Sequence, residues 1–312
     1  MNRHSASVKG RTALVVAVVL VLVGVGVGLR YGVAWRRPAG EDGPHGKQPQ
    51  EQGVTAEDGV KQPSEATAGA PRIDTRTPLA KQLQELQGLP RDLPRAEVKR
   101  VRALVQDRTL NETARNLALV ALERQQQPVR ELGSVLVDIW QDTEDTARMR
   151  DFALQHLPVV YGYATNQPEI LAVLRQAAQE PSGRTMNHAG TAMMSLQTLG
   201  ARVPAAGASA RELARACMAA DNEELDGEKA VVALQILRVA EDDSVLPRAR
   251  RLAADEGALA RLRLSAISLV ATVGDRDDVP LLQRLTKDRD SRVRRVAGFQ
   301  LKQLQKRCEP DA

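Results

Sequence analysis

The stretch that decides the fold is LRLSAISLVATVGDRDDVPLLQRLTKDRDSRVRRVAGFQLKQL, Leu262–Leu304. Its apolar residues recur at spacings of three and four, which is the period of an α-helix with one buried side. Acidic clusters interrupt this period twice, and Gly274 and Pro280 flank the first cluster as helix end and helix start. Asp277 or Asp278 is expected to accept free amide protons where a helix begins. The stretch therefore predicts helices joined by short acidic turns, in which the charges are structural.

The same pattern recurs along the chain. In most units an aspartate is followed by a cation, a small residue and an apolar residue 8, 11 and 15 positions later, and the last unit is two residues tighter. The aspartate is expected to cap a helix, and the small residue to lie where neighbouring helices approach. The matching sets are Asp107, Arg115, Ala118 and Leu122; Asp142, Arg150, Ala153 and Leu157; Asp255, Arg263, Ala266 and Val270; the related Asp221, Lys229, Val232 and Ile236; and the tighter Asp288, Arg294, Ala297 and Leu301.

This pattern resembles the HEAT repeat family, specifically the short HEAT-like repeats of the phycobilisome-lyase type. The match is best over 262–304 and weakens toward the N-terminus. In a degenerate unit, 168–200, Glu180 and His188 replace the aspartate and the arginine. The resemblance implies an all-α, right-handed superhelical α-solenoid of about six helical pairs, with a concave face suited to an elongated partner. The units that fit are 94–125, 128–158, 207–240, 244–273 and 277–306.

Composition also favours helices over sheets. Of the 312 residues, 43% are hydrophobic and 27% charged, which is enough for a buried core, but only 2% are aromatic. Sheets rely on aromatic and β-branched residues, whereas Ala, Leu, Arg, Glu and Gln dominate from Pro78 onward. The formal charge of +5 is modest for this length, so no nucleic-acid partner is expected.

No cofactor, metal site or catalytic residue is predicted. Cys217 and Cys308 are the only cysteines, so they form no zinc site or disulfide framework, and their separate units predict two free thiols. HEAT-like iron hydroxylases carry His-Glu pairs, which this chain lacks. Its histidines are followed instead by Ser5, Gly46, Leu157 and Ala189.

The N-terminal residues predict a membrane anchor. Residues 12–29 are uncharged and mostly apolar, and at about 1.5 Å per residue they span roughly 27 Å, close to the thickness of a bilayer core. We expect a transmembrane segment over 12–34, with a cleaved secretory signal as the alternative. Gly24 and Gly28 have the GxxxG spacing of a weak homodimer, although small apolar filler explains them as well. The short basic segment before the span, residues 1–11, favours a single-pass protein of the bacterial inner membrane with its body in the periplasm.

Composition then divides the rest of the chain. Residues 35–77 are rich in Gly, Pro, Gln and Glu without an apolar period, which predicts a disordered linker. The expected organisation is therefore a basic segment over 1–11, the anchor over 12–34, the linker over 35–77, the solenoid over 78–307 and a tail over 308–312.

Two groups of residues are candidates for binding a partner. Charge reverses along the repeats, from 4 basic against 9 acidic residues in 205–243 to 15 basic against 9 acidic in 244–312. Tyr161 and Tyr163 lie in the longest connection between units, where packing beneath the loop is the alternative role. Arg294 aligns with the arginines of the repeat and is expected to be buried. The basic candidates are Arg292, Arg295, Lys302 and Lys306.

Together these features predict a non-catalytic, membrane-tethered protein–protein interaction scaffold. Its partners would be a protein of unknown identity and, through the N-terminal helix, the membrane. One alternative is a HEAT-like enzyme of the bilin-lyase or glycosylase type, for which aromatic residues that grip flat rings are scarce. The other is a membrane-surface binding module formed by the basic C-terminal end.

Overall fold

The computed structural model describes residues 78–181, 187–219 and 227–309, all within the second of two compact units of the chain, Thr67–Ala312. Over these residues the chain forms thirteen α-helices and two short 3-10 helices, and no strand. The prediction of an all-α fold is confirmed for this part of the chain.

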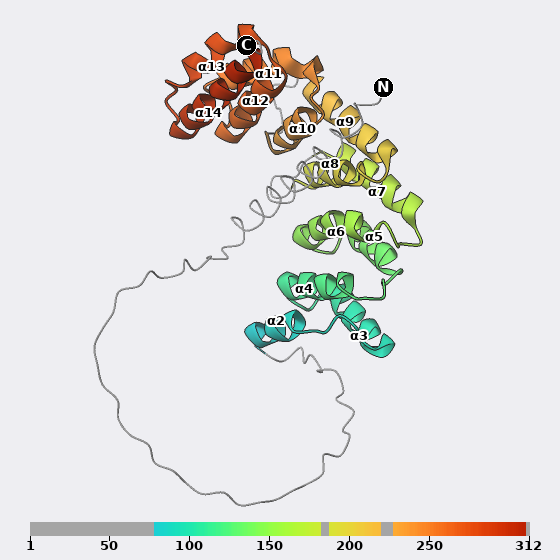
Figure 1. Ribbon diagram of the computed structural model, residues 1–312. Coiled ribbons are helices and arrows are strands. Elements are labelled where there is room, and N and C mark those ends of the chain that lie inside the picture. Colours follow the sequence, from blue (N-terminus) through green and yellow to red (C-terminus); the bar gives the residue numbers. More distant parts are fainter. Residues whose placement is uncertain (1–77, 182–186, 220–226, 310–312) are drawn as a thin grey trace, which may run out of the picture. The chain divides into compact units, whose positions relative to one another are not determined.

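The helices follow one another with short connections (Figure 1). The 3-10 helices are η1, Asp243–Val245, and η2, Arg276–Asp278. The α-helices are α2 Leu79–Gln87, α3 Arg95–Gln106, α4 Glu112–Glu123, α5 Leu132–Gln141, α6 Ala147–Val160, α7 Gln167–Gln179, α8 His188–Leu199, α9 Pro204–Ala219, α10 Gly227–Val239, α11 Leu246–Ala254, α12 Ala260–Val273, α13 Val279–Leu285 and α14 Ser291–Cys308.

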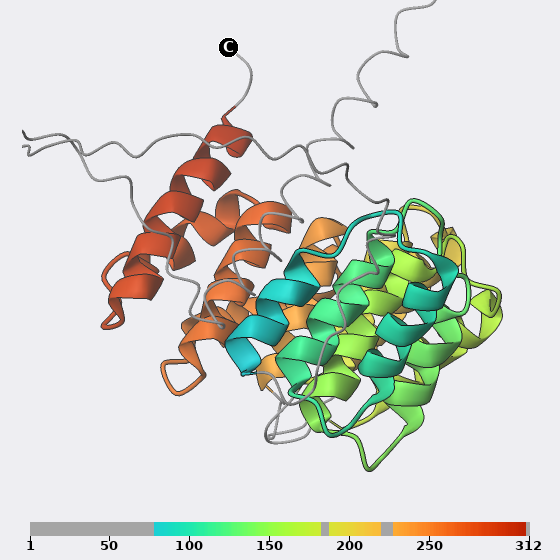
Figure 2. The same cartoon turned by 90° about the horizontal axis from the view of Figure 1, so that it is seen from below.

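The helices stack in two layers. The even-numbered helices contact one another in order from α2 to α14, and the odd-numbered helices do the same from α3 to α13, with η1 between α9 and α11. Each odd-numbered helix also packs on the even-numbered helix that follows it. Figure 2 shows α2 to α6 lying side by side. This is a helical repeat arrangement, in which each pair buries its apolar side only against its neighbours.

Six helical pairs, from α3–α4 to α13–α14, coincide with the six units found in the sequence. Helix α2 was missed, because it carries neither the aspartate nor the arginine of the repeat. It starts after Pro78 without a side-chain cap and buries Gln82 and Leu86. Helix α2 packs on α4, so it covers the first pair of the stack.

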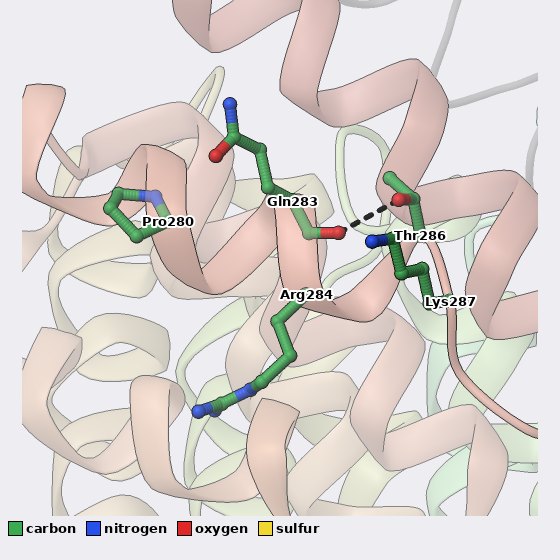
Figure 3. A pocket seen from close by; sticks show the side chains of 5 residues that line it. All are labelled: Pro280, Gln283, Arg284, Thr286 and Lys287. Atoms are coloured by element: carbon green, nitrogen blue, oxygen red, sulfur yellow. Dashed lines mark hydrogen bonds between the residues drawn. The ribbon is translucent and has the colours of Figure 1, made fainter.

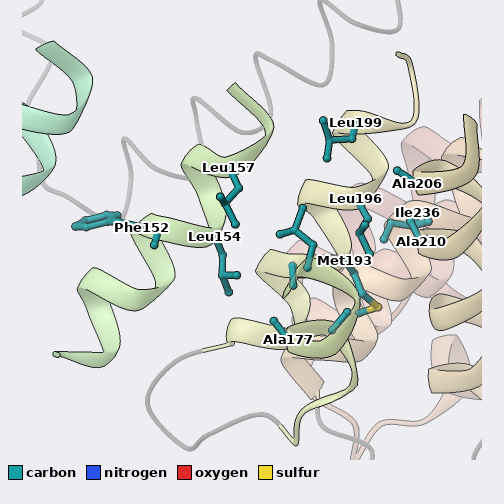
Figure 4. Packing of buried hydrophobic residues seen from close by; sticks show 14 of the residues in the cluster. Phe152, Leu154, Leu157, Ala177, Met193, Leu196, Leu199, Ala206, Ala210 and Ile236 are labelled. Atoms are coloured by element: carbon teal, nitrogen blue, oxygen red, sulfur yellow. The ribbon is translucent and has the colours of Figure 1, made fainter. Parts of the chain in front are cut away.

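Small residues let the helices approach closely. The predicted small position of the repeat is fully buried in four units, at Ala118, Ala153, Ala266 and Ala297. In the middle of the stack, alanines of α9 lie beside apolar side chains of α8 and α10 (Figure 4). A Cβ atom on Gly200 would lie 2.7 Å from the Cα of Gly207, so α8 and α9 meet backbone to backbone.

The turn before α13 differs in detail from its prediction. Asp275, rather than Asp277 or Asp278, is the N-cap of η2 and accepts the Asp277 amide proton at 3.0 Å. Asp278 accepts the Asp275 amide proton in return, and Pro280 lies in the first turn of α13 as predicted. Gly274 is not in a left-handed conformation. Glycine is needed here because a side chain would not fit: a Cβ atom would lie 2.2 Å from a carboxylate oxygen of Asp278.

The predicted anchor, its Gly24 and Gly28 pair and the predicted linker lie outside the described residues. Within the described ranges, no helix combines the length and apolar character that a membrane crossing requires. Cys217 lies on α9 and Cys308 at the end of α14, and neither forms a disulfide.

Candidate binding surface on the last helix

Arginines of the repeat join successive units through buried ion pairs. Arg115 on α4 donates from Nε to the Val105 carbonyl at 2.8 Å and from both terminal nitrogens to Asp145 at 2.8 and 2.6 Å. Both side chains of this pair are 2% exposed. Burial of the Asp145 carboxyl acts to raise its pKa, but the hydrogen bonds from Arg115 and from the Thr146 amide, together with the charges of Arg115 and Arg108, outweigh it and the pKa is lowered. The structural role predicted for this arginine is confirmed.

Arg263 on α12 repeats this geometry near the other end of the stack. Its Nε donates to the Ala253 carbonyl at 3.2 Å, and its terminal nitrogens bind the Asp288 carboxylate. These hydrogen bonds lower the pKa of Asp288. In both junctions the acceptor carbonyl lies 10 residues before the arginine, and the carboxylate comes from the next turn between helices.

The predicted capping role of the aspartates is wrong for the start of the second helices. Asp107, Asp142 and Asp255 are the residues that end α3, α5 and α11. Their carboxylates accept amide protons two residues later, which begins the turn and leaves the helix start to another residue. Asn111, Thr146 and Asp290 then cap α4, α6 and α14. Asp221 lies outside the described residues.

The middle junction uses aromatic contacts instead of an ion pair. Arg150 donates to the Trp140 carbonyl at 2.9 Å and stacks over the Trp140 ring. His188 contacts the Ala147 carbonyl at 2.8 Å and the edge of the same ring. Lys229 donates to the Glu180 carbonyl at 3.3 Å. The degenerate unit, 168–200, is therefore still bonded to both neighbouring units, although Glu180 and His188 replace the aspartate and the arginine.

A polar cluster between α4 and α6 was missed. His156 contacts Glu123 through Nδ1 at 2.7 Å and Asn116 through Nε2 at 2.9 Å. Both ring nitrogens are thus occupied by the preceding unit, and the cluster joins two helices. The residue pair is 33 positions apart, one repeat length, which is the signal that could have revealed it.

The two candidate tyrosines are half-buried against the core. Burial, with the nearby charge of Glu123, raises the pKa of Tyr163 to about 12. Tyr161 ends α6, and its carbonyl accepts a hydrogen bond from Gln167 at 2.9 Å. The structure therefore places both side chains in the packing of the α6–α7 connection, while their predicted role in binding stays untested.

The four basic candidates lie together on α14. Their spacing of three, seven and four residues keeps them on one side of a helix. The opposite side buries Val293, Ala297 and Leu304. Phe299 lies among the four cations and is 60% exposed, an unusual position for a phenylalanine in this chain. We call this surface the α14 face, defined by Arg292, Arg295, Phe299, Lys302 and Lys306.

Three members of this face have no partner among the described residues. Arg295, Lys302 and Lys306 make no hydrogen bond or ion pair there, whereas Arg292 binds Asp290 at 2.7 Å. The predicted burial of Arg294 is wrong. Arg294 is exposed and donates to the carbonyls of Asp288 and Arg289, and none of the described residues places a carboxylate against it.

Contacts at the C-terminal end fix the position of α14. Arg307 donates to the carbonyls of Thr272 and Gly274, and Arg276 donates to the Cys308 carbonyl at 2.8 Å. These bonds tie both sides of the turn after α12 to the end of α14. The α14 face is therefore held on a rigid element, which favours specific binding.

A shallow hollow of about 570 Å³ lies on α13 (Figure 3). Arg284 and Lys287 contribute cations, and Thr286 Oγ1 donates to the Gln283 carbonyl at 2.7 Å. Helix α13 and the two residues after it supply all of its lining, so the hollow is open on its other sides. In the described parts of the chain, no three His, Cys, Asp or Glu residues are grouped to hold a metal ion.

No protein-family model and no curated protein matches the chain. Among solved structures, human deoxyhypusine hydroxylase in complex with glycerol matches at 16% sequence identity and a TM-score of 0.33, covering 75% of this chain and 93% of that one. Nothing of that protein's site is carried over at this TM-score. The helical repeat-like fold rests on the arrangement of the helices themselves.

This neighbour corrects the function predicted from the sequence. It is an enzyme, and the finding contradicts the prediction of a non-catalytic, membrane-tethered scaffold, which we withdraw. The prediction that the chain is no enzyme has no support either. The candidate residues on α14 and the protein partner are not affected by this comparison.

Proposed function

We propose that the helical unit binds an acidic segment of a partner protein on the α14 face. This proposal takes over neither the membrane tether nor the absence of catalysis from the withdrawn prediction. The observation that carries it is the arrangement on α14, where Arg295, Lys302 and Lys306 lie around an exposed Phe299 and have no partner within the described part of the chain.

The chemistry of the face favours a protein over a lipid surface. Helices that lie on membranes present a broad apolar side. Here the exposed side of α14 presents a single large apolar side chain, Phe299, among its cations. A central aromatic anchor within a charged rim is typical of the energetically important part of a protein interface.

Binding to a synthetic acidic helix tests the proposal. The probe carries glutamates on one side around a central leucine, and a matched lysine helix is the negative probe. Replacing Arg292, Arg295, Lys302 and Lys306 together by Ser should slow association about tenfold at low salt and less at moderate salt, because steering by charge is screened. Phe299→Ala should instead speed dissociation about tenfold or more.

The matched control removes four exposed cations elsewhere. Replacing Arg95, Lys99, Arg130 and Arg211 by Ser changes the net charge equally, and none of these side chains has a described partner. This variant should associate nearly as fast as the original protein. Equal rates for the original and the α14 variant at every salt concentration would overturn the proposal. So would binding to vesicles of phosphatidylserine and phosphatidylcholine without binding to the acidic helix.

A further inference from the structure

The junctions inside the stack show which side of an even-numbered helix receives the next unit. On α4, Arg115 binds Asp145 in the next turn, and Asn116 and Glu123 contact His156 on α6. Arg115 is the repeat arginine, and Asn116 and Glu123 lie one and eight residues after it. The position four residues after it holds Leu119, which is fully buried.

The same positions on α14 are exposed or open. The arginine position is Arg294, and the positions one and eight residues later are Arg295 and Lys302. The position four residues later is Gly298, where an added Cβ atom would meet nothing within 4 Å. In α12 that position is Ile267, which is fully buried. The side of α14 on which another pair would pack therefore carries three cations and an open space.

We infer that the acidic partner segment is a helical hairpin that packs on this end as a further pair, with a carboxylate of its turn bound by Arg294. This inference rests on the proposed function and names the partner's form. Internal units show the geometry required, because Arg115 and Arg263 each bind one carboxylate of the following turn with two terminal nitrogens. An arginine fork and a carboxylate make a strong, directional pair of hydrogen bonds.

A second copy of this chain does not suit the site. The N-terminal end of the stack is already covered by α2, which packs on α4. Residues 78–110 carry seven basic residues against four acidic ones, so this end would repel the α14 face. The occupant is a different, acidic chain.

A polar end cap alone does not account for these residues. Terminal units of repeat proteins need a polar outer side for solubility, and charges of either sign provide it. Here three of the four receiving positions are cationic and the fourth is Gly298, and an exposed Phe299 beside them lowers solubility. A surface built for an acidic partner explains both features.

The test uses the full-length protein and a disulfide-closed hairpin peptide. The hairpin has two helices of about twelve residues joined by DTEDT, the sequence of the turn at 142–146 that presents Asp145 to Arg115. A second hairpin carries asparagine at the position of Asp145. The linear acidic helix used above, matched in charge, is the third probe.

The hairpin should bind about tenfold or more tightly than the linear helix, since a charged, bidentate contact is added. Arg294→Gln should reduce hairpin binding to the level of the linear helix, and Arg294→Lys should retain part of it. The asparagine hairpin should bind the original protein as weakly as the first hairpin binds the Arg294→Gln variant. The asparagine hairpin and the Arg294→Gln variant together should show no further loss of affinity. The thermal midpoint of each variant shows that it is folded.

The outcomes separate this inference from the proposed function. Equal binding of hairpin and linear helix, both lost in the quadruple Ser variant, would overturn the hairpin and leave the acidic segment. Hairpin binding that is unchanged in the Arg294→Gln variant would also overturn the inference of a hairpin. Binding of neither probe would overturn both proposals.

Discussion

Arg263 and Arg294 occupy the same position in consecutive units, yet one is buried and the other exposed. Arg263 is 5% exposed and binds Asp288 of the following turn. Arg294 finds no such carboxylate and bonds to carbonyls of its own unit. Within the described residues, a repeat arginine is therefore buried where a turn of the following helical pair supplies its carboxylate, as Asp288 does for Arg263.

The largest expected effect is loss of an internal ion pair. Arg115→Ala should lower the free energy of unfolding by about 3–5 kcal/mol, because it leaves the buried Asp145 without its partner. The matched change at the end of the stack, Arg294→Ala, should cost far less, because the side chain is exposed. Urea denaturation of both variants measures this. Equal losses would remove the distinction between internal and terminal arginines.

Asp288→Ala sharpens the same comparison within one turn. If Asp288 were only a turn residue, the loss would be about 0.5–2 kcal/mol. Its buried bond to Arg263 predicts about 3 kcal/mol or more. Asp290→Ala is the control, since Asp290 caps α14 from a half-buried position without a buried ion pair and its loss should be smaller. A smaller loss for Asp288→Ala than for Asp290→Ala would contradict the ion-pair role.

Acid should weaken the internal junctions. The folded-state pKa values of Asp145 and Asp288 are lowered, so their contribution is complete above the unfolded-state pKa near 3.8 and is lost as pH falls through the folded values. The free energy of unfolding should therefore fall between pH 5 and pH 3. Asp288→Asn should show a shallower fall over the same range. An unchanged slope in that variant would exclude Asp288 as a source of the pH dependence.

The close packing of α8 against α9 in the middle of the stack should not tolerate an added methyl group. Gly200→Ala places a methyl group 2.7 Å from the Cα of Gly207, so α8 and α9 must move apart. We expect a loss of about 1–3 kcal/mol, the usual range for overpacking. Thermal unfolding measures it, with Gly88→Ala as a control at a helix end where the nearest atom lies at an ordinary 3.4 Å. No loss would mean that this helix contact is looser than the structure shows.

The sequence predicts the helical pairs well, because their apolar period and small positions are local. It does not predict the partners of the polar residues. The aspartates at the ends of the first helices looked like caps, yet Asp145, three residues after one of them, is what Arg115 binds. Such pairings depend on how units stack, and 30 residues separate these two partners. The exposure of Arg294 was missed for the same reason.

The candidate surface was predicted in part. The four cations were found from their density, whereas Phe299 was not, because an apolar residue in an amphipathic helix normally belongs to its buried side. Its place three or four residues from Arg295 and Lys302 was the available signal. A residue that breaks the apolar period of a helix is informative when it is aromatic and flanked by like charges.

The smallest expected effect is a gain at the end of the stack. Gly298 lies inside α14 with open space around the position of a Cβ atom, in contrast to Gly200. Gly298→Ala should therefore stabilise the unbound protein by about 0.5–1 kcal/mol, because alanine restricts the unfolded chain and favours the helix. A hairpin packing on Arg294 and Lys302 would have to accommodate the added methyl group between them, so its dissociation should become faster. A variant that is more stable and binds the hairpin more weakly would place Gly298 at the contact, whereas lower stability would show that this side of α14 is already covered in the unbound protein.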